Sequence, residues 1–394
     1  MSNVPKRRFA GFSRDWEEKP LETVAKYENG KAHEKEIDET GDYVVVNSKF
    51  ISTNGEVKKF TKSAICIAKK DDILMVLSDV PNGRAIAKCF FVDTDNLYTV
   101  NQRICKLTPN KAVSVLLFYS LNRSPYFLAF DDGVKQTNLR KDDVLNCPIL
   151  LPPDLKEQQK IANCLSSIDT LITAQTQKLD TLKAHKKGLM QQLFPATGET
   201  IPKRRFPEFR YAGDWEEKPL GEVVKFLDGK RKPIKESDRA SMQGRHPYYG
   251  ASGIIDYVNN FIFDEDLILL GEDGENIVSR NLPLVFKVSG KYWVNNHAHV
   301  LKPKKPHSLE FLVQYMETLS YIKYNSGGAQ PKLNQAVCKT IPLILPLLPE
   351  QQKIANCLTS IDDLITAQTQ KIESLKAHKK GLMQQLFPAS EEMA

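Results

Sequence analysis

Paired cysteines, long apolar segments and nucleotide-binding loops are all missing from this chain of 394 residues. Its seven cysteines form no CxxC pair, which argues against a disulfide framework or a zinc site and for a reducing, cytoplasmic compartment. No apolar run approaches the roughly 20 residues of a membrane span, and the N-terminal MSNVPKRRF has no apolar signal segment. No GxxxxGKS or GxxxxGKT loop is present, so the chain itself is not expected to be a translocase.

A strong excess of one charge is also lacking, since the formal net charge is only +7. Local basic runs are more informative, at residues 6–8, 203–205, 230–232 and 302–305. Several such runs permit nucleic-acid binding without proving it, because any single run can be a solvated surface. The hydrophobic fraction of 41% suffices for ordinary cores, and the length predicts two or three domains.

The dominant feature of the chain is one long stretch that occurs twice. Residues 157–195 and 350–388 are identical at 34 of 39 positions. Within each copy, mostly apolar residues recur at alternating spacings of four and three, the pattern of a coiled-coil helix. About 37 residues at 1.5 Å each make a rod of roughly 55 Å. A lone apolar stripe would be left in water, so we expect the two helices to bury their stripes against each other as an antiparallel pair.

The predicted seam positions are Ile161, Leu165, Ile168, Ile172, Gln175, Leu179, Leu182, Lys186, Leu189 and Leu193, and in the second copy Ile354, Leu358, Ile361, Ile365, Gln368, Ile372, Leu375, Lys379, Leu382 and Leu386. Identity extends to polar residues that packing alone does not demand: Asn163, Gln177, Lys183, His185, Gln191 and Gln192 recur as Asn356, Gln370, Lys376, His378, Gln384 and Gln385. A recent duplication would explain this, and so would two copies of one partner docking on two equivalent surfaces. The second interpretation is favoured because the segments between the copies differ far more.

A second repeat frames each half of the chain. The leader at 5–31 returns at 202–230, and each long helix follows a short proline-flanked apolar segment, PILLPP or PLILPLLP. The unit is thus a tandem duplication of roughly 195 residues. We predict an α+β fold with a pseudo-two-fold axis, in which two long antiparallel coiled-coil helices separate two mixed β-rich globules. The predicted domains are 1–150 and 196–345 for the globules, and 151–195 and 346–394 for the helical regions.

The two regions inside the frames look like globules rich in short strands. In the first we expect strands at 43–46, 64–68 and 73–77, a turn at Asn54-Gly55, and a helix near 111–121. In the second we expect strands at 253–258 and 266–270 and a helix at 308–321. A repeated frame with two different inserts suggests one scaffold with two specificities, and a linear ligand read at two points suits it. Duplex DNA is the obvious candidate.

The chain resembles the specificity (S) subunit of bacterial type I restriction-modification systems over nearly its whole length. The proline-flanked strand followed by EQQKIA is typical of that family. The other motifs that carry the resemblance are YYGASG (248–253), GEDG (271–274), VNNHAHVL (294–301) and SGGAQPKLN (326–334), with fainter counterparts VNQR (100–103) and GVKQTNL (133–139). The resemblance implies two target-recognition domains, each reading half of a bipartite DNA site, and helices that dock two methyltransferase subunits. Restriction subunits that translocate DNA would join them.

Chemistry is expected on those partners and not on this chain. S-adenosylmethionine, and ATP and Mg²⁺ for restriction, would bind there. An adenine methyltransferase needs a Gly-rich cofactor loop and an Asn/Asp-Pro-Pro-aromatic motif; the nearest match, 124–127, lacks both the amide and the second proline. Asp154 and Glu157 stand where helix capping explains them better than a nuclease site. His297 and His299 lack a carboxylate or cysteine at ligand spacing, so no metal site is predicted.

Polar residues of the globules fit DNA reading better, because Arg, Lys, Asn and Gln can bind base edges and phosphates. Asn295, Asn296, His297 and His299 are expected mainly to stabilise a turn. The candidate DNA-contacting residues are Arg84, Gln102, Arg103, Lys135 and Gln136 in the first globule, and Lys230, Arg231, Arg245, Tyr248, Ser252, Asn276, Arg280, Gln330 and Lys332 in the second.

Two other functions compete with a non-catalytic DNA-recognition subunit. One is a stand-alone DNA methyltransferase or nuclease, which the missing cofactor and metal motifs oppose. The other is a coiled-coil scaffold that binds two proteins and no DNA, and DNA mobility-shift experiments with methyltransferase subunits present would separate it.

The uninterrupted seam predicts that the helices act as a ruler between the two half-sites. Adding one heptad to both helices preserves the seam and lengthens each by about 10.5 Å. At roughly 3.4 Å per base pair, the spacer between the methylated half-sites should grow by about three base pairs, with both half-sites unchanged. Mapping methylated sites measures this. The added pairs also rotate one half-site around the duplex, so activity can fall; an active variant that kept the original spacer would exclude the helices as the ruler.

Overall fold

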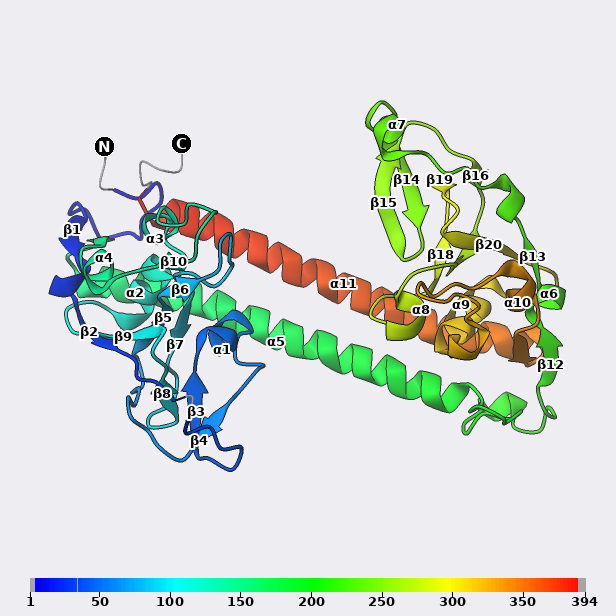
Figure 1. The fold of residues 1–394 in the computed structure, drawn as a ribbon, viewed down its shortest axis with the longest axis horizontal. Coiled ribbons are helices and arrows are strands. Elements are labelled where there is room, and N and C mark those ends of the chain that lie inside the picture. Colours follow the sequence, from blue (N-terminus) through cyan, green and yellow to red (C-terminus); the bar gives the residue numbers. More distant parts are fainter. Residues whose placement is uncertain (1–3, 34, 389–394) are drawn as a thin grey trace. The chain divides into compact units, whose positions relative to one another are not determined.

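The structure is a computed structural model that describes residues 4–33 and 35–388, and it has the α+β fold expected from the sequence (Figure 1). Its residues form two compact units. Unit 1 contains 4–175 and 372–388, and unit 2 contains 176–371. Each unit therefore holds one β-rich globule and one part of each long helix. The boundaries between the units lie within both long helices, because the units are groups of residues that pack together. The domain boundaries predicted from the sequence instead coincide with the ends of the repeated segments.

Unit 1 is built on two small sheets. The first has four antiparallel strands in the order β2-β9-β5-β7: Ala25–Asn29, Ile104–Pro109, Ile73–Val76 and Cys89–Phe91. The second has the order β4-β3-β8: Phe60–Thr61, Tyr43–Val46 and Tyr98–Val100. In this second sheet β3 and β8 run parallel. The short elements that complete the globule are α1 Ser48–Ser52, β6 Ser78–Asp79, α2 Ser114–Leu121, α3 Pro125–Leu128, β10 Thr137–Asn138 and α4 Lys141–Leu145.

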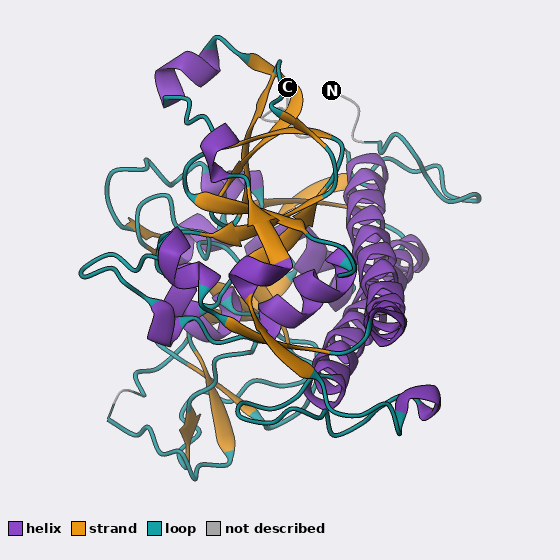
Figure 2. Cartoon of the chain, turned by 90° about the vertical axis from the view of Figure 1, so that its right-hand side faces the viewer, coloured by secondary structure: helices purple, strands orange, loops and turns teal. Residues whose placement is uncertain are grey.

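Unit 2 repeats this plan. Its first sheet has the order β13-β20-β17-β18: Val224–Phe226, Ala298–Pro303, Leu267–Gly271 and Val285–Val288. Its second sheet has the order β15-β14-β19-β16: Gly253–Val258, Gln243–Gly250, Lys291–Val294 and Phe263–Asp264, with β14 and β19 parallel. The helices of the globule are α6 Leu220–Val223, α7 Glu236–Ala240, α8 Asn276–Ser279, α9 Leu309–Thr318 and α10 Gln335–Lys339. Loops connect these short elements and make up much of what Figure 2 shows.

The repeated frame closes each globule in the same way. In unit 1, β1 (Glu17–Pro20) of the leader pairs antiparallel with β11 (Pro148–Leu151), directly before the long helix. In unit 2, β12 (Glu216–Pro219) pairs with β21 (Pro342–Leu345) in the matching register. Edge strands tolerate proline, which cannot donate to a ladder. The proline-flanked strands expected from the sequence are therefore confirmed, and each has the EEKP segment of its own leader as partner.

Two long helices, α5 (Leu155–Leu193) and α11 (Leu348–Leu386), confirm the main sequence prediction. All twenty predicted seam positions are buried or half-buried. Within unit 1, Ile161 of α5 and Leu386 of α11 belong to one hydrophobic cluster. Within unit 2, Leu193 and Ile354 belong to another. As numbers rise along one helix they fall along the other, so the segments pair antiparallel in both units.

An ion pair marks the same place in each seam. In unit 1, Lys379 Nζ lies 2.7 Å from both carboxylate oxygens of Asp169, which also accepts a hydrogen bond from the Tyr119 hydroxyl at 2.6 Å. In unit 2, Lys186 meets Asp362 at 2.7 Å, and Gln314 donates to the same carboxylate. A charged residue at a seam position favours one register over its neighbours. In each unit this carboxylate also connects the globule to the helix pair.

Each leader binds the ends of the long helices through a half-buried arginine that pairs with a buried carboxylate. Arg8 donates to both carboxylate oxygens of Glu157, at 2.6 and 2.8 Å. Arg205 does the same with Glu350, at 2.8 and 2.5 Å. Both carboxylates are 1% exposed. Leader backbone amides also bond to the opposite helix end, Arg7 to Gln385 and Arg204 to Gln192. The basic runs at 6–8 and 203–205 therefore fasten each leader to the long helices as a structural clasp.

Most local predictions hold, and the exceptions are instructive. Strands at 43–46, 73–76, 253–258 and 267–271 and the helices at 114–121 and 309–318 are confirmed. The strand expected at 64–68 is wrong: only one bridge, Ile67 to Thr99, forms there. Asp154 caps the start of α5 by accepting the Lys156 amide, as expected, but Glu157 holds Arg8.

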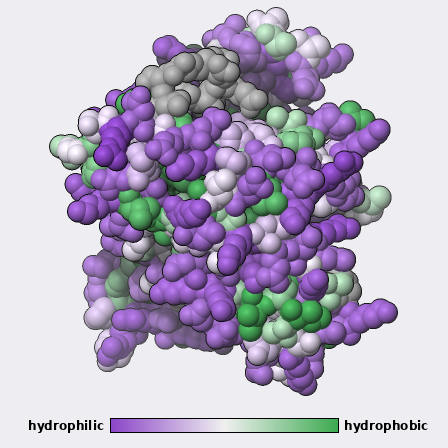
Figure 3. All heavy atoms as spheres, turned by 90° about the vertical axis from the view of Figure 1, so that its left-hand side faces the viewer, coloured by the Kyte–Doolittle hydropathy of each residue, from purple (hydrophilic) through white to green (hydrophobic). Residues whose placement is uncertain are grey.

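The face of unit 1 seen in Figure 3 is mainly hydrophilic with small separate apolar patches.

Replacing Arg8 by alanine should destabilise unit 1 by about 3–5 kcal/mol, because it leaves the buried Glu157 carboxylate without a counter-ion. The double variant Arg8→Ala/Glu157→Gln should recover much of that loss. Both changes in the free energy of unfolding can be measured by denaturant titration, with the hydrogen exchange of the β1 and β11 amides as the probe. Lys6→Ala, an exposed residue of the same leader, is the matched control. An Arg8→Ala variant as stable as the Lys6→Ala variant would contradict the clasp.

Candidate nucleic-acid interface

The candidate site in each unit lies where two parallel strands end. Parallel strands bring their carboxyl ends to the same edge of a sheet. In unit 1 these are β3 and β8, followed by Asn47 and by the loop at 101–103. In unit 2 they are β14 and β19, followed by the turn at 251–252 and by the loop at 295–297. The VNQR and VNNHA motifs thus occupy equivalent places.

Three loops of unit 2 are held together by backbone hydrogen bonds. The Glu272 amide donates to the His297 carbonyl at 2.9 Å, and the Leu333 amide donates to the Glu272 carbonyl at 2.7 Å. Gly271 lies so close to the Ala251 carbonyl that a Cβ would sit 2.7 Å from it, so the glycine permits this approach. The GEDG, VNNHA, SGGAQPKLN and YYGASG motifs therefore meet at one edge of the globule.

A buried charge cluster lies beneath these loops. His299, 1% exposed, points Nδ1 at Asp228 and Nε2 at the Leu333 carbonyl, both at 2.7 Å. Two acceptors require two N–H donors, so the ring is an imidazolium. Burial opposes the charge, but the Asp228 carboxylate outweighs it and raises the pKa of His299 to about 10. Burial likewise works to raise the pKa of Asp228, while the hydrogen bond from His299 lowers it overall. Among residues 4–33 and 35–388, no group of three or more His, Cys, Asp or Glu side chains is placed to hold a metal ion.

Several predicted contact residues of unit 2 have structural partners instead. Arg231 belongs to the cluster, donating to Glu272 at 2.6 Å and to the Ala298 carbonyl at 2.8 Å. Tyr248 is 1% exposed, and its hydroxyl accepts the Ile234 amide. Neither side chain is available to a ligand in this conformation: the charge of Arg231 is neutralised by Glu272, and Tyr248 is part of the hydrophobic core.

The remaining unit 2 candidates divide by exposure. Arg280 pairs with Glu317, whose pKa is raised by burial, and Asn276 closes its own loop by bonding to Leu282. Lys332 lies 3.4 Å from Glu272 and keeps an exposed side chain. Ser252 is half-buried in the turn between β14 and β15. Lys230, Arg245 and Gln330 are exposed as well. Asn295 accepts the His297 amide at 2.8 Å, which confirms its expected role in the turn.

All five candidates of unit 1 are exposed: Arg84, Gln102, Arg103, Lys135 and Gln136. The structure brings three of them into two adjoining loops, 80–84 and 131–136, which the β6–β10 pair supports. Asn82 Nδ2 donates to the Gly133 carbonyl across these loops at 3.0 Å. Gln136 also bonds to Ser78 at 2.7 Å. The β6–β10 pair corresponds to the antiparallel Asp273–Lys332 bridge, which joins the GEDG and SGGAQPKLN loops of unit 2.

Two exposed valines were missed by sequence reasoning. Val80 is 63% exposed and Val134 is 76% exposed, one in each of the two adjoining loops. Exposed β-branched side chains beside Arg84 and Lys135 can contact apolar groups such as the thymine methyl. An isolated valine in a polar loop gives no signal in the sequence, so only the exposure reveals it.

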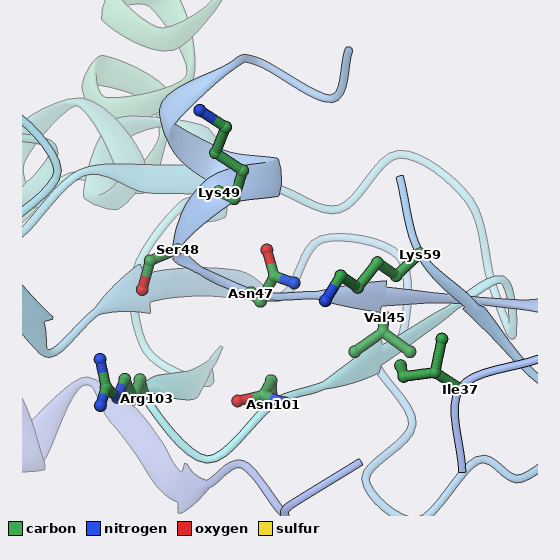
Figure 4. A pocket seen from close by; sticks show the side chains of 8 residues that line it. All are labelled: Ile37, Val45, Asn47, Ser48, Lys49, Lys59, Asn101 and Arg103. Carbon is green, nitrogen blue, oxygen red and sulfur yellow. The ribbon is translucent and has the colours of Figure 1, made fainter. Parts of the chain in front are cut away.

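A basic hollow of about 310 Å³ adjoins the Arg103 loop. Arg103, Lys49 and Lys59 contribute three cations to its lining, and Asn47, Ser48 and Asn101 add polar groups. In Figure 4, Lys59 and Arg103 lie on opposite sides of the lining, and Lys49 projects from α1 away from both. Lys49 and Lys59 were not among the predicted contacts, because single lysines in a basic chain do not stand out.

Comparisons with known proteins agree with this arrangement. The family model described as "Type I restriction modification DNA specificity domain" matches residues 13–184 and again 212–377. A type I restriction enzyme specificity subunit of Methanocaldococcus jannaschii is 26% identical over 404 residues, covering 95% of this chain and 92% of its own. A putative specificity subunit of Haemophilus influenzae is 36% identical over 147 residues, 37% of each chain.

The fold has a solved counterpart as well. The crystal structure of the S subunit of a type I restriction-modification system from M. genitalium superposes with a TM-score of 0.68 at 18% identity. That match covers 98% of this chain and all of the other. No helix of the described residues is long and apolar enough to cross a membrane. Since the family model matches both halves, the chain belongs to the type I restriction-modification specificity subunits and carries two DNA specificity domains.

Proposed function

We propose that this chain is the non-catalytic, sequence-reading subunit of a type I restriction-modification complex. Units 1 and 2 each read one half of a bipartite duplex DNA target. The observation that carries the proposal is the contrast between the near-identical frame and the two different globules, whose loops meet at equivalent strand ends. A constant scaffold with two different reading edges suits a ligand with two different half-sites.

The outward faces of the long helices support docking of two copies of one methyltransferase subunit. All twelve repeated polar positions, from Asn163 to Gln192 and from Asn356 to Gln385, are exposed. Leu171 and Leu364 occupy equivalent positions and are 41% and 55% exposed. Identical exposed faces offer the same partner two sites. Restriction subunits would join through the methyltransferases, and S-adenosylmethionine, ATP and Mg²⁺ would bind to those partners.

Two alternatives make different demands on the surface. A scaffold that binds two proteins and no DNA needs the helix faces but not the cationic hollow or the basic exposed loops. A stand-alone methyltransferase or nuclease needs a cofactor loop or a metal cluster, and neither motif stands in the sequence. The exposed cations at the strand ends therefore favour DNA reading over both.

The purified chain with S-adenosylmethionine alone should transfer no methyl group to DNA. With the methyltransferase subunit of its system, it should direct adenine methylation in a bipartite sequence. Tritium incorporation and methylation-sensitive sequencing measure the two outcomes. Methyl transfer by the chain alone would overturn the assignment as non-catalytic. A complex that forms but shows no preference for any DNA sequence would favour the scaffold.

Exchanging one globule should change one half-site only. Replacing residues 20–148 with the same region of a relative keeps the leader clasp residue Arg8 and the whole of α5. Methylated sequences should then keep the half-site read by unit 2 and acquire a new first half. The reciprocal exchange of residues 219–342 is the control, and it should alter the other half. Both halves changing in either exchange would exclude independent reading.

A further inference from the structure

We propose that the basic hollow of unit 1 binds a phosphate group of the DNA backbone beside the first half-site. The hollow is defined by Arg103, Lys59, Lys49, Asn47 and Ser48. The inference rests on the proposed DNA-reading function and deepens it, because it names the group and the atoms that position unit 1 on the duplex.

Charge is the first argument. Three of the eight lining side chains are cationic, and no lining residue carries a carboxylate. Some lysines of unit 1 have a carboxylate partner, as Lys62 has Asp38 and Lys106 has Glu28. Within 4–33 and 35–388, neither Arg103 nor Lys59 has a carboxylate within ion-pair distance. Like charges gathered round one concavity raise its potential and attract an anion.

Hydrogen-bond donors are the second argument. Ser48 Oγ is hidden from solvent and has no hydrogen-bond partner among the described residues. Figure 4 shows it on the side of the hollow where Arg103 lies. Asn47 Oδ1 accepts the Phe50 amide at 2.9 Å, which leaves its Nδ2 as a donor. The planar guanidinium of Arg103 suits two oxygens of one phosphate. An orphaned hydroxyl among donors fits an acceptor-only ligand.

Position points to the DNA backbone as the source of that phosphate. The Arg103 carbonyl accepts the Leu77 amide at 2.9 Å, next to Ser78, which in turn binds Gln136. The hollow thus adjoins the loops that carry Arg84, Val80 and Val134. Phosphate contacts fix the register of a protein on DNA, while base edges supply specificity. A phosphate bound here would place those loops against the adjacent bases.

The test uses the full chain in complex with its methyltransferase subunit, on DNA carrying the mapped target. Arg103→Gln and Lys59→Gln should each weaken binding and lower the slope of log affinity against log salt by about 0.9. The methylated sequence should stay the same, because a phosphate carries no base identity. Lys26→Gln and Lys70→Gln, exposed lysines outside the hollow, are matched controls that keep the wild-type slope. Arg103→Lys should restore the slope.

Neutral methylphosphonate linkages locate the contact. One linkage beside the first half-site should weaken the wild-type complex and leave the Arg103→Gln complex unaffected. Wild-type salt slopes in the variants, altered methylated sequences, or no linkage coupled to Arg103 would each overturn the proposal while DNA reading stands. Calorimetric binding of tripolyphosphate that needs Arg103, without such a linkage, would assign the hollow to a free phosphate. A wild-type complex that binds all DNA sequences equally well would overturn the proposed function itself.

Discussion

Each long helix carries an apolar stripe that is buried against the other helix and against the globule core of the same unit, and the rest of the fold depends on that burial. In unit 1 the early turns of α5 meet the late turns of α11, and in unit 2 the reverse holds. Hydrophobic contact alone does not choose a register, because a shift by one heptad buries the same kinds of side chain. The Asp169–Lys379 and Asp362–Lys186 pairs supply that choice. Charge at the seam therefore contributes specificity more than stability.

The same constraint explains which parts of the chain can differ. Arg8 and Arg205 hold the leaders to Glu157 and Glu350, and EEKP strands pair with the strands before each helix. The residues between the leader and the strand before each long helix can therefore differ without disturbing the helix pair. Unit 1 follows β3 with the short helix α1, whereas unit 2 follows β14 with the hairpin strand β15. The same frame thus supports different local structures in the two units, at the strand ends that form the candidate DNA interface.

Sequence patterns predicted the frame well because its signals are strong and local. The heptad seam, the prolines and the repeat needed no tertiary information. Individual contact residues were harder, since a basic residue that reads DNA and one that neutralises a buried carboxylate look alike. Arg231 is an example: the Asp228, Glu272 and His299 that surround it come from three separate segments. The strand expected at 64–68 does not form, because this run has only one bridging partner in the folded unit. As with Arg231, the sequence does not show which segments become its neighbours.

The two units handle positive charge in opposite ways, and this bears on how each would hold DNA. Unit 2 buries Arg231 and the His299 imidazolium against Asp228 and Glu272, so these charges stiffen the loops and are compensated within the protein. Unit 1 leaves Arg103 and Lys59 facing a hollow without a carboxylate. Compensated charges release few counterions when DNA binds, whereas uncompensated ones release counterions for every phosphate neutralised. Among these cations, Arg103 and Lys59 of unit 1 should therefore add to the salt dependence of DNA binding, whereas Arg231 and His299 of unit 2 should add little and instead fix the shape of the loops.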